Sequence, residues 1–165
     1  MKSSLDDCSK GPYGTPFGAW DVSGVTDMSG MFAVTSFNAD VSKWDVSRVT
    51  DMNGMFNHAT SFDGDLSQWD VSRVTDMDDM FASATSFNGD LSLWDVSRVQ
   101  SMIRMFKGAS SFKQRLCGAA WVNSKASKDD MFTDSLGSIS LTVCGACCIG
   151  IDISFTFSPQ HNRAL

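Results

Sequence analysis

The chain has 165 residues, enough for a single domain, and its 19 acidic residues outnumber its 13 Lys and Arg residues. The formal net charge of −6 disfavours nucleic acid as a partner. Every acidic residue is Asp and none is Glu, a composition that suits turns, caps and short strands better than long helices.

The chain is predicted to begin with a lead-in, residues 1–19, that makes only part of an N-terminal cap. Its first residues, MKSSLDDCSKGPYG, contain no apolar core of a signal peptide, so we expect no secretory signal within this chain. A partial cap would leave an open edge, on which a second copy of the chain could stack.

Four repeat units are predicted over residues 20–115. Each begins with nearly the same nine-residue motif, WDVSGVTDM, WDVSRVTDM, WDVSRVTDM and WDVSRVQSM. The spacings between the starts of successive motifs are 24, 25 and 25 residues. A fixed period of this length means that each unit buries its apolar face only by stacking on its neighbours. The motifs begin at Trp20, Trp44, Trp69 and Trp94.

Within the third unit the apolar period changes along the chain. Trp69 and Val71 are two residues apart, which predicts a short strand. The spacing i, i+3, i+4 and i+7 follows over residues 77–84 and predicts a helix of about two turns, with Thr75 as its N-cap. The predicted fold class is therefore an α/β repeat, a leucine-rich-repeat-like solenoid of strand-turn-short-helix units with a parallel sheet.

Stacking of equivalent residues predicts an internal core of aromatic and methionine ladders. Because the aromatic and methionine residues fall at the inward positions of the repeat, we expect them to form a core rather than to line a ligand pocket. The predicted ladders are Trp44, Trp69 and Trp94; Phe62, Phe87 and Phe112; Met55, Met80 and Met105; and Phe56, Phe81 and Phe106.

The repeats are predicted to end in an atypical capping unit, residues 116–135, and an irregular apolar tail, residues 136–165. The tail is a poor membrane helix because Asp152 interrupts it and Ser, Thr and Gly dilute it. The cysteines at 144, 147 and 148 are too close together for a convincing zinc site.

The unit WDVSxVTDMxxMFxxAxSFNxDLSx resembles that of the BspA-like leucine-rich-repeat surface proteins, over about residues 13–132. That repeat was catalogued as a mycoplasma lipoprotein-associated domain of unknown function. The resemblance implies a cell-surface or extracellular protein for adhesion or protein interaction, without catalytic residues. LCGAAW and DMF resemble the closing unit, in which a Cys after the Leu pairs with one beyond the Met-Phe. TDSLGSIS follows Phe132 without a Cys, so the partner of Cys117 stays open, with Cys144 as a substitute.

An Asp and Arg striped face is the candidate site for a protein or glycan partner. Asp follows the Trp of each unit by one residue, Arg follows that Asp by three residues in the last three units, and a variable residue precedes each of these Trp residues. An alternative interpretation of each Asp is structural, in which the carboxylate hydrogen-bonds its own backbone. The candidate residues are Lys43, Asp45, Arg48, Gln68, Asp70, Arg73, Leu93, Asp95 and Arg98.

A calcium-stabilised array is the alternative hypothesis, because pairs of oxygen ligands with one residue between them recur in the bends. The simpler interpretation is that such bends require Asn and Asp for turn formation. No cofactor is expected otherwise, and no enzyme is expected, because nearly every polar residue recurs once per unit. The candidate calcium ligands are Asp40, Asp63, Asp65, Asn88 and Asp90, with Asn38 beside them.

Overall fold

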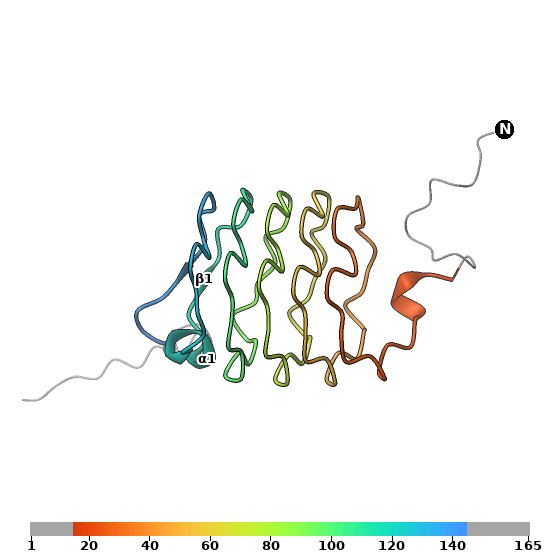
Figure 1. Ribbon diagram of the computed structural model, residues 1–165, viewed down its shortest axis with the longest axis horizontal. Coiled ribbons are helices and arrows are strands. Elements are labelled where there is room, and N and C mark those ends of the chain that lie inside the picture. Colours follow the sequence, from red (N-terminus) through yellow and green to blue (C-terminus); the bar gives the residue numbers. More distant parts are fainter. Residues whose placement is uncertain (1–14, 145–165) are drawn as a thin grey trace, which may run out of the picture.

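The computed structural model describes residues 15–144. Successive repeats lie side by side along its long axis (Figure 1). Regular secondary structure is sparse in this part of the chain. It consists of a 3-10 helix η1 (Phe17–Ala19), strand β1 (Arg115–Leu116), helix α1 (Ala119–Asn123) and strand β2 (Ser138–Ile139). The N-terminal part of the lead-in, the tail beyond 144, Cys147 and Cys148 lie outside the described residues.

The predicted fold class is wrong. Within residues 15–144, the repeats contain neither the predicted strands nor the predicted short helices, and β1 and β2 form a two-stranded parallel pair near the C-terminal end. The repeats consist of turns joined by isolated parallel bridges. The bridges link Asp27 to Asp51, Asp51 to Asp76, Asp76 to Ser101, and Ser101 to Ser127.

The predicted helix over residues 77–84 is replaced by a turn segment, and the same holds in every repeat. Alternate N–H groups of this segment donate to carbonyls of the next repeat instead of to residue i−4. Met77 N donates to Ser101 O at 3.0 Å, and Phe81 N donates to Met105 O at 2.8 Å. Thr75 likewise does not cap a helix, because its hydroxyl donates to Thr50 O. We use the term turn segments for residues 28–34, 52–58, 77–83, 102–108 and 128–134.

Each turn segment holds two residues in the left-handed region, four positions apart. In the second repeat these are Gly54, at φ +59°, and His58, at φ +57°. Two such residues within five positions are incompatible with a right-handed α-helix. The apolar residues at helical spacing are therefore carried by turns instead of by a helix. The other pairs are Gly30 and Val34, Asp79 and Ser83, Arg104 and Gly108, and Asp130 and Asp134.

Ser83→Gly is expected to stabilise the protein by roughly 0.5–1 kcal/mol, since it removes the left-handed strain of a residue with a Cβ at φ +56°. Gly108 occupies the same position in the next repeat. Denaturant unfolding measures the change, and Ser83→Ala is the control because it keeps the strain. Equal stability of the Gly and Ala variants would contradict the assignment.

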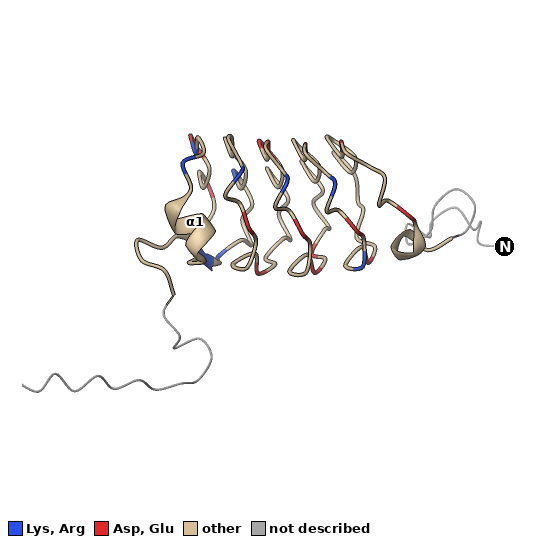
Figure 2. Ribbon diagram, turned by 90° about the horizontal axis from the view of Figure 1, so that it is seen from below, with Lys and Arg blue, Asp and Glu red and all other residues tan. Residues whose placement is uncertain are grey.

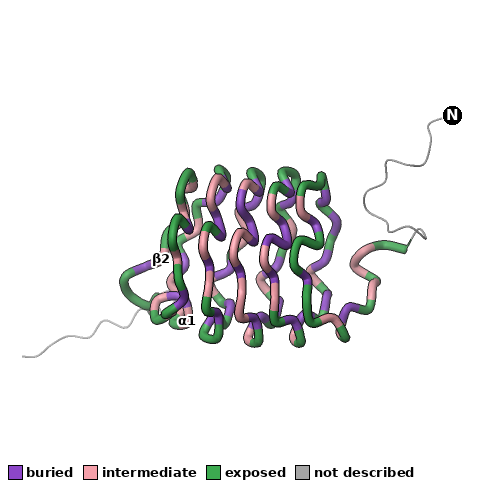
Figure 3. The backbone as a smooth tube through the Cα atoms, viewed as in Figure 1, coloured by how far each residue is buried: buried purple, intermediate pink, exposed green. Residues whose placement is uncertain are grey.

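The predicted core positions are confirmed, although the elements that carry them differ. The methionines, phenylalanines and tryptophans of the predicted ladders are buried, and the tube in Figure 3 alternates between buried and exposed residues in each repeat. Trp44 and Trp69 are stacked with ring centroids 6.5 Å apart. Phe62, Phe87 and Phe112 are stacked at 5.9 and 6.0 Å.

Each tryptophan of the ladder also ties two repeats together through its indole N–H. The donor reaches a backbone carbonyl in the preceding repeat at 2.8–3.0 Å. Trp121 in α1 is a further member that the sequence comparison of repeats missed. The donor and acceptor pairs are Trp44 and Phe17, Trp69 and Val41, Trp94 and Leu66, and Trp121 and Leu91.

Candidate functional site

All nine residues of the predicted striped face are exposed. Figure 2 shows Asp and basic segments recurring from repeat to repeat. The variable position before each Trp projects into solvent, and Leu93 there is 82% exposed. The structure therefore leaves all nine side chains exposed, in segments whose Trp residues are buried in the ladder. We call the nine residues the striped face.

The Asp side chains of this face are held by their own backbone, as the structural interpretation predicted. In each repeat the carboxylate accepts the N–H of the Ser two residues later, at 3.1 Å for Asp45 and 3.0 Å for both Asp70 and Asp95. The ion pairs within residues 15–144 lie elsewhere, between Arg104 and Asp79 and between Lys107 and Asp130. Within residues 15–144, the Arg side chains of the striped face therefore form no close ion pair, although Arg48 and Arg98 attract Asp45 and Asp95 through space.

Hydrogen bonding lowers the pKa of two Asp residues of this face, Asp45 and Asp95. The hydroxyl of Ser47 and then its backbone N–H lower the pKa of Asp45 below its ordinary 3.8, while neighbouring Asp21 acts in the opposite direction. The pKa of Asp95 is lowered in the same way by Ser97. The striped face therefore presents fixed negative charges beside basic side chains.

Acid is expected to destabilise the protein because the pKa of these Asp residues is lower in the folded than in the unfolded chain. Their contribution is complete above the unfolded pKa of about 4 and is lost as the pH falls through the lower folded values. Thermal unfolding between neutral and acidic pH measures this loss. Ser47→Ala should weaken the acid dependence, because it removes the largest cause of the lowered pKa of Asp45, whereas the exposed Ser61→Ala should not.

The side-chain oxygens of the candidate calcium ligands already accept hydrogen bonds from backbone N–H groups, and these bonds form two sets. Asn38 and Asp63 belong to one set, in which each side-chain oxygen accepts an N–H of the next repeat, at 3.1 and 3.0 Å. Asn88 continues this set by accepting the N–H of Lys113 at 3.0 Å. No group of three or more His, Cys or acidic side chains within residues 15–144 is arranged to hold a metal ion. The second set comprises Asp40, Asp65 and Asp90, which accept the N–H groups of Ser42, Ser67 and Ser92.

An apolar recess at the first repeat was not predicted. Phe17, Trp20, Met31, Phe32 and Phe37 line most of it, and its volume is about 400 Å³. Met31 is 39% exposed here, whereas Met55, at the same position of the next repeat, is fully buried. The recess therefore marks the place where a preceding repeat would pack.

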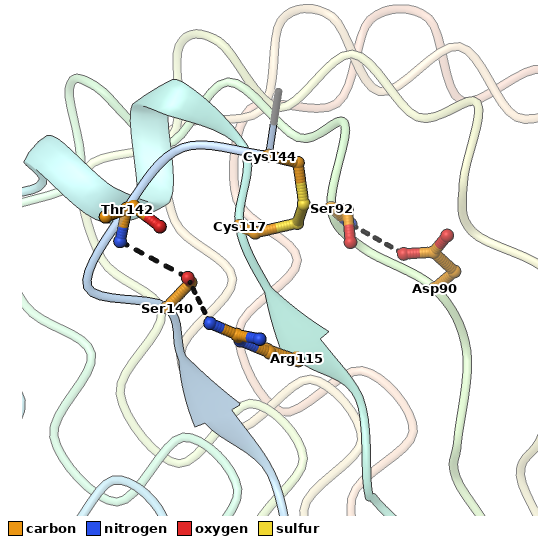
Figure 4. Close-up of a disulfide and its surroundings, with 7 residues drawn as sticks. All are labelled: Asp90, Ser92, Arg115, Cys117, Ser140, Thr142 and Cys144. Atoms are coloured by element: carbon orange, nitrogen blue, oxygen red, sulfur yellow. Dashed lines mark hydrogen bonds between the residues drawn. A yellow bond between two sulfur atoms is a disulfide. The ribbon is translucent and has the colours of Figure 1, made fainter. Parts of the chain in front are cut away.

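At the other end, Cys117 forms a disulfide with Cys144, across a Cα–Cα distance of 5.2 Å (Figure 4). The Cys144 N–H also donates to Cys117 O at 3.0 Å. Arg115 supports the same segment by donating to the hydroxyl of Ser140 at 2.9 Å. The substitute partner predicted for Cys117 is thus the one observed.

Stacked turns, recurring ladders and a disulfide-closed end define a repeat protein with an exposed, regularly striped face. The chain belongs to the family described as Mycoplasma protein of unknown function, DUF285, whose family model matches residues 1–135. No curated protein and no solved structure matches the chain. Among the described residues, no helix is long and apolar enough to cross a membrane.

Proposed function

We propose that this protein is a non-catalytic interaction or adhesion module of the BspA-like surface-protein type, and that the striped face binds a protein or glycan. The carrying observation is the exposure of all nine residues in rows that recur with the repeat. Because the Arg side chains of the face form no close ion pair within residues 15–144, their guanidinium groups are available to an acidic or polar ligand.

Rigidity of the support favours recognition by this face. The Trp ladder lies directly beneath it, and each indole is fixed by a hydrogen bond to the preceding repeat. A preorganised surface loses less conformational entropy when it binds a partner. Lys43, Gln68 and Leu93 give the variable row one basic, one polar and one apolar side chain, so this row would tune specificity.

An extracellular or cell-surface location is part of the proposal. The disulfide between Cys117 and Cys144 supports it, because disulfides persist in oxidising compartments and are rare in reducing ones. The non-catalytic role is supported by the recurrence of the polar residues, since catalysis needs a constellation of distinct groups.

Binding of the full chain to a printed glycan array and to a panel of purified extracellular proteins tests the proposal. A bound partner is expected to lose at least about tenfold in affinity for the Arg48→Ser/Arg73→Ser variant. Lys113→Ser removes an exposed positive charge outside the striped face and should bind normally. Equal losses for both variants, or the absence of any partner for the wild-type chain, would contradict the role of this face.

A calcium-stabilised structural array is the alternative proposal, and calcium titration distinguishes it. We expect the midpoint of thermal unfolding to be the same with calcium and with chelator, because the candidate oxygens already accept backbone N–H groups. A calcium-dependent rise that disappears in Asp65→Ser would favour the alternative. Ser61→Ala serves as the control variant on the exposed surface.

A further inference from the structure

The two ends of the repeat stack present opposite backbone groups. In the second turn segment, the carbonyl of Asp51 accepts from Met28, and the next N–H, that of Met52, donates onward to Asp76. Both groups belong to one peptide unit, so this unit is aligned along the stack. Four such units recur in each internal turn segment, with N···O distances of 2.7–3.0 Å throughout.

This alignment leaves acceptors at one end and donors at the other. No described donor reaches the first-repeat carbonyls of Asp27, Ser29, Met31 and Ala33. At the last turn segment, no described acceptor is found for the N–H groups of Lys128, Asp130, Phe132 and Asp134. We call these the acceptor edge and the donor edge. Aligned peptide dipoles make the donor edge partly positive and the acceptor edge partly negative.

Side-chain charge differs between the two ends. Residues 15–42 contain three Asp and no Lys or Arg, whereas the donor edge carries Lys125 and Lys128 beside Asp129, Asp130 and Asp134. Burial, and then the charge of Lys125, lower the pKa of Lys128. A carboxylate such as Asp27 of a second copy would favour the charged form of this Lys. Lys125 and Lys128 complement the acidic first repeat, whereas the three Asp side chains of the donor edge oppose it, so the backbone polarity carries the complementarity between the two ends.

Apolar groups at the ends are complementary as well. The ladder of Phe32, Phe56, Phe81, Phe106 and Phe132 has centroids 5.5 Å apart at every step. Phe132 is only half-buried, and Phe32 borders the open recess. A further step from Phe132 to Phe32 of another copy would continue this ladder and fill the recess.

We propose that the acceptor edge of one copy binds the donor edge of a second copy, head to tail through their turn segments. The donors Lys128, Asp130, Phe132 and Asp134 then face the carbonyls of Asp27, Ser29, Met31 and Ala33. α1 lies at the lower margin of the stack in Figure 1. A heterologous contact of this kind does not close on itself, so the product is an open-ended assembly.

Sedimentation velocity of the full chain over a wide concentration range tests the contact. The wild-type protein is expected to show a rising average mass. Ser29→Asp puts a carboxylate opposite Asp129 of the second copy and should weaken association by at least about tenfold. Ser61→Asp adds the same charge on an exposed middle repeat and should associate as the wild type does.

Charge exchange makes the test specific. Ser29→Asp/Asp129→Arg should recover association, because an Arg and Asp pair already links neighbouring repeats at Arg104 and Asp79. Met31→Asp is a second blocking variant, and thermal unfolding checks that each variant is folded. A wild-type monomer at every concentration would overturn the proposal and indicate that the edges are covered in another way. Association that neither blocking variant weakens would also overturn it.

Discussion

Replacing Trp94 by Ala is expected to lower the free energy of unfolding by about 3–5 kcal/mol. Trp94 is 2% exposed, and its indole N–H donates to Leu66 O at 2.9 Å. The substitution leaves a cavity between repeats, which accounts for most of the expected loss. It also removes one of two donors to Leu66 O, which still accepts the N–H of Trp69 at 3.1 Å. Denaturant unfolding followed by circular dichroism gives the change.

Gln68→Ala is the control for this prediction, because Gln68 lies on the exposed side of the same part of a repeat. Its effect on the free energy of unfolding should be near zero. Trp94→Phe should fall between the two, since it keeps much of the apolar volume but removes the indole donor. A loss for Gln68→Ala as large as that for Trp94→Ala would refute the assignment of inward and outward positions.

Loss of the disulfide between Cys117 and Cys144 is expected to cost about 3.5 kcal/mol, from the loop-closure entropy of residues 27 apart in sequence. The bond restrains segment 136–144, whose backbone pairs with that of 112–117. Its removal should therefore loosen the C-terminal end first. Unfolding of Cys117→Ser, with and without reductant, measures the effect.

Single and double variants provide the control for the disulfide. Cys117→Ser, Cys144→Ser and the double variant should lose similar stability, since each removes the same bond. Reductant should destabilise the wild-type protein by a similar amount and leave the double variant unchanged. Additive losses from the two single variants would show that the cysteines contribute separately.

The sequence predicts the core of this protein better than its backbone. Met77, Met80, Phe81 and Ala84 are buried as their spacing indicates, but that spacing also fits a turn segment. The deciding hydrogen bonds run to the next repeat, so a single unit does not reveal them. Gly54, in the left-handed region, was the available local signal against a helix.

The ends and the polar ladders were predictable only in part. Trp121 follows Trp94 by 27 residues rather than 25, because α1 interrupts the period, and its place in the ladder was therefore missed. Asn38, Asp63 and Asn88 recur at one position, where the sequence predicts bends, but the structure has irregular backbone with neither a turn nor a bend there. Their bonds to the backbone of the neighbouring repeat depend on the stacking itself. The exposure of the Asp row and of the variable row, by contrast, follows directly from the two-residue alternation around Trp. The Arg row lies four residues after Trp, where that alternation would predict a buried residue, so its exposure does not follow from it.

The bonds between repeats have a consequence for the gene that encodes this chain. A turn segment bonds only to the repeats immediately before and after it among the described residues. Duplication of one 25-residue unit would therefore insert a new turn segment whose backbone donors and acceptors pair with those of the repeats on either side. Each duplication would lengthen the striped face by one row without altering either end, so binding reach could change by recombination while folding is preserved.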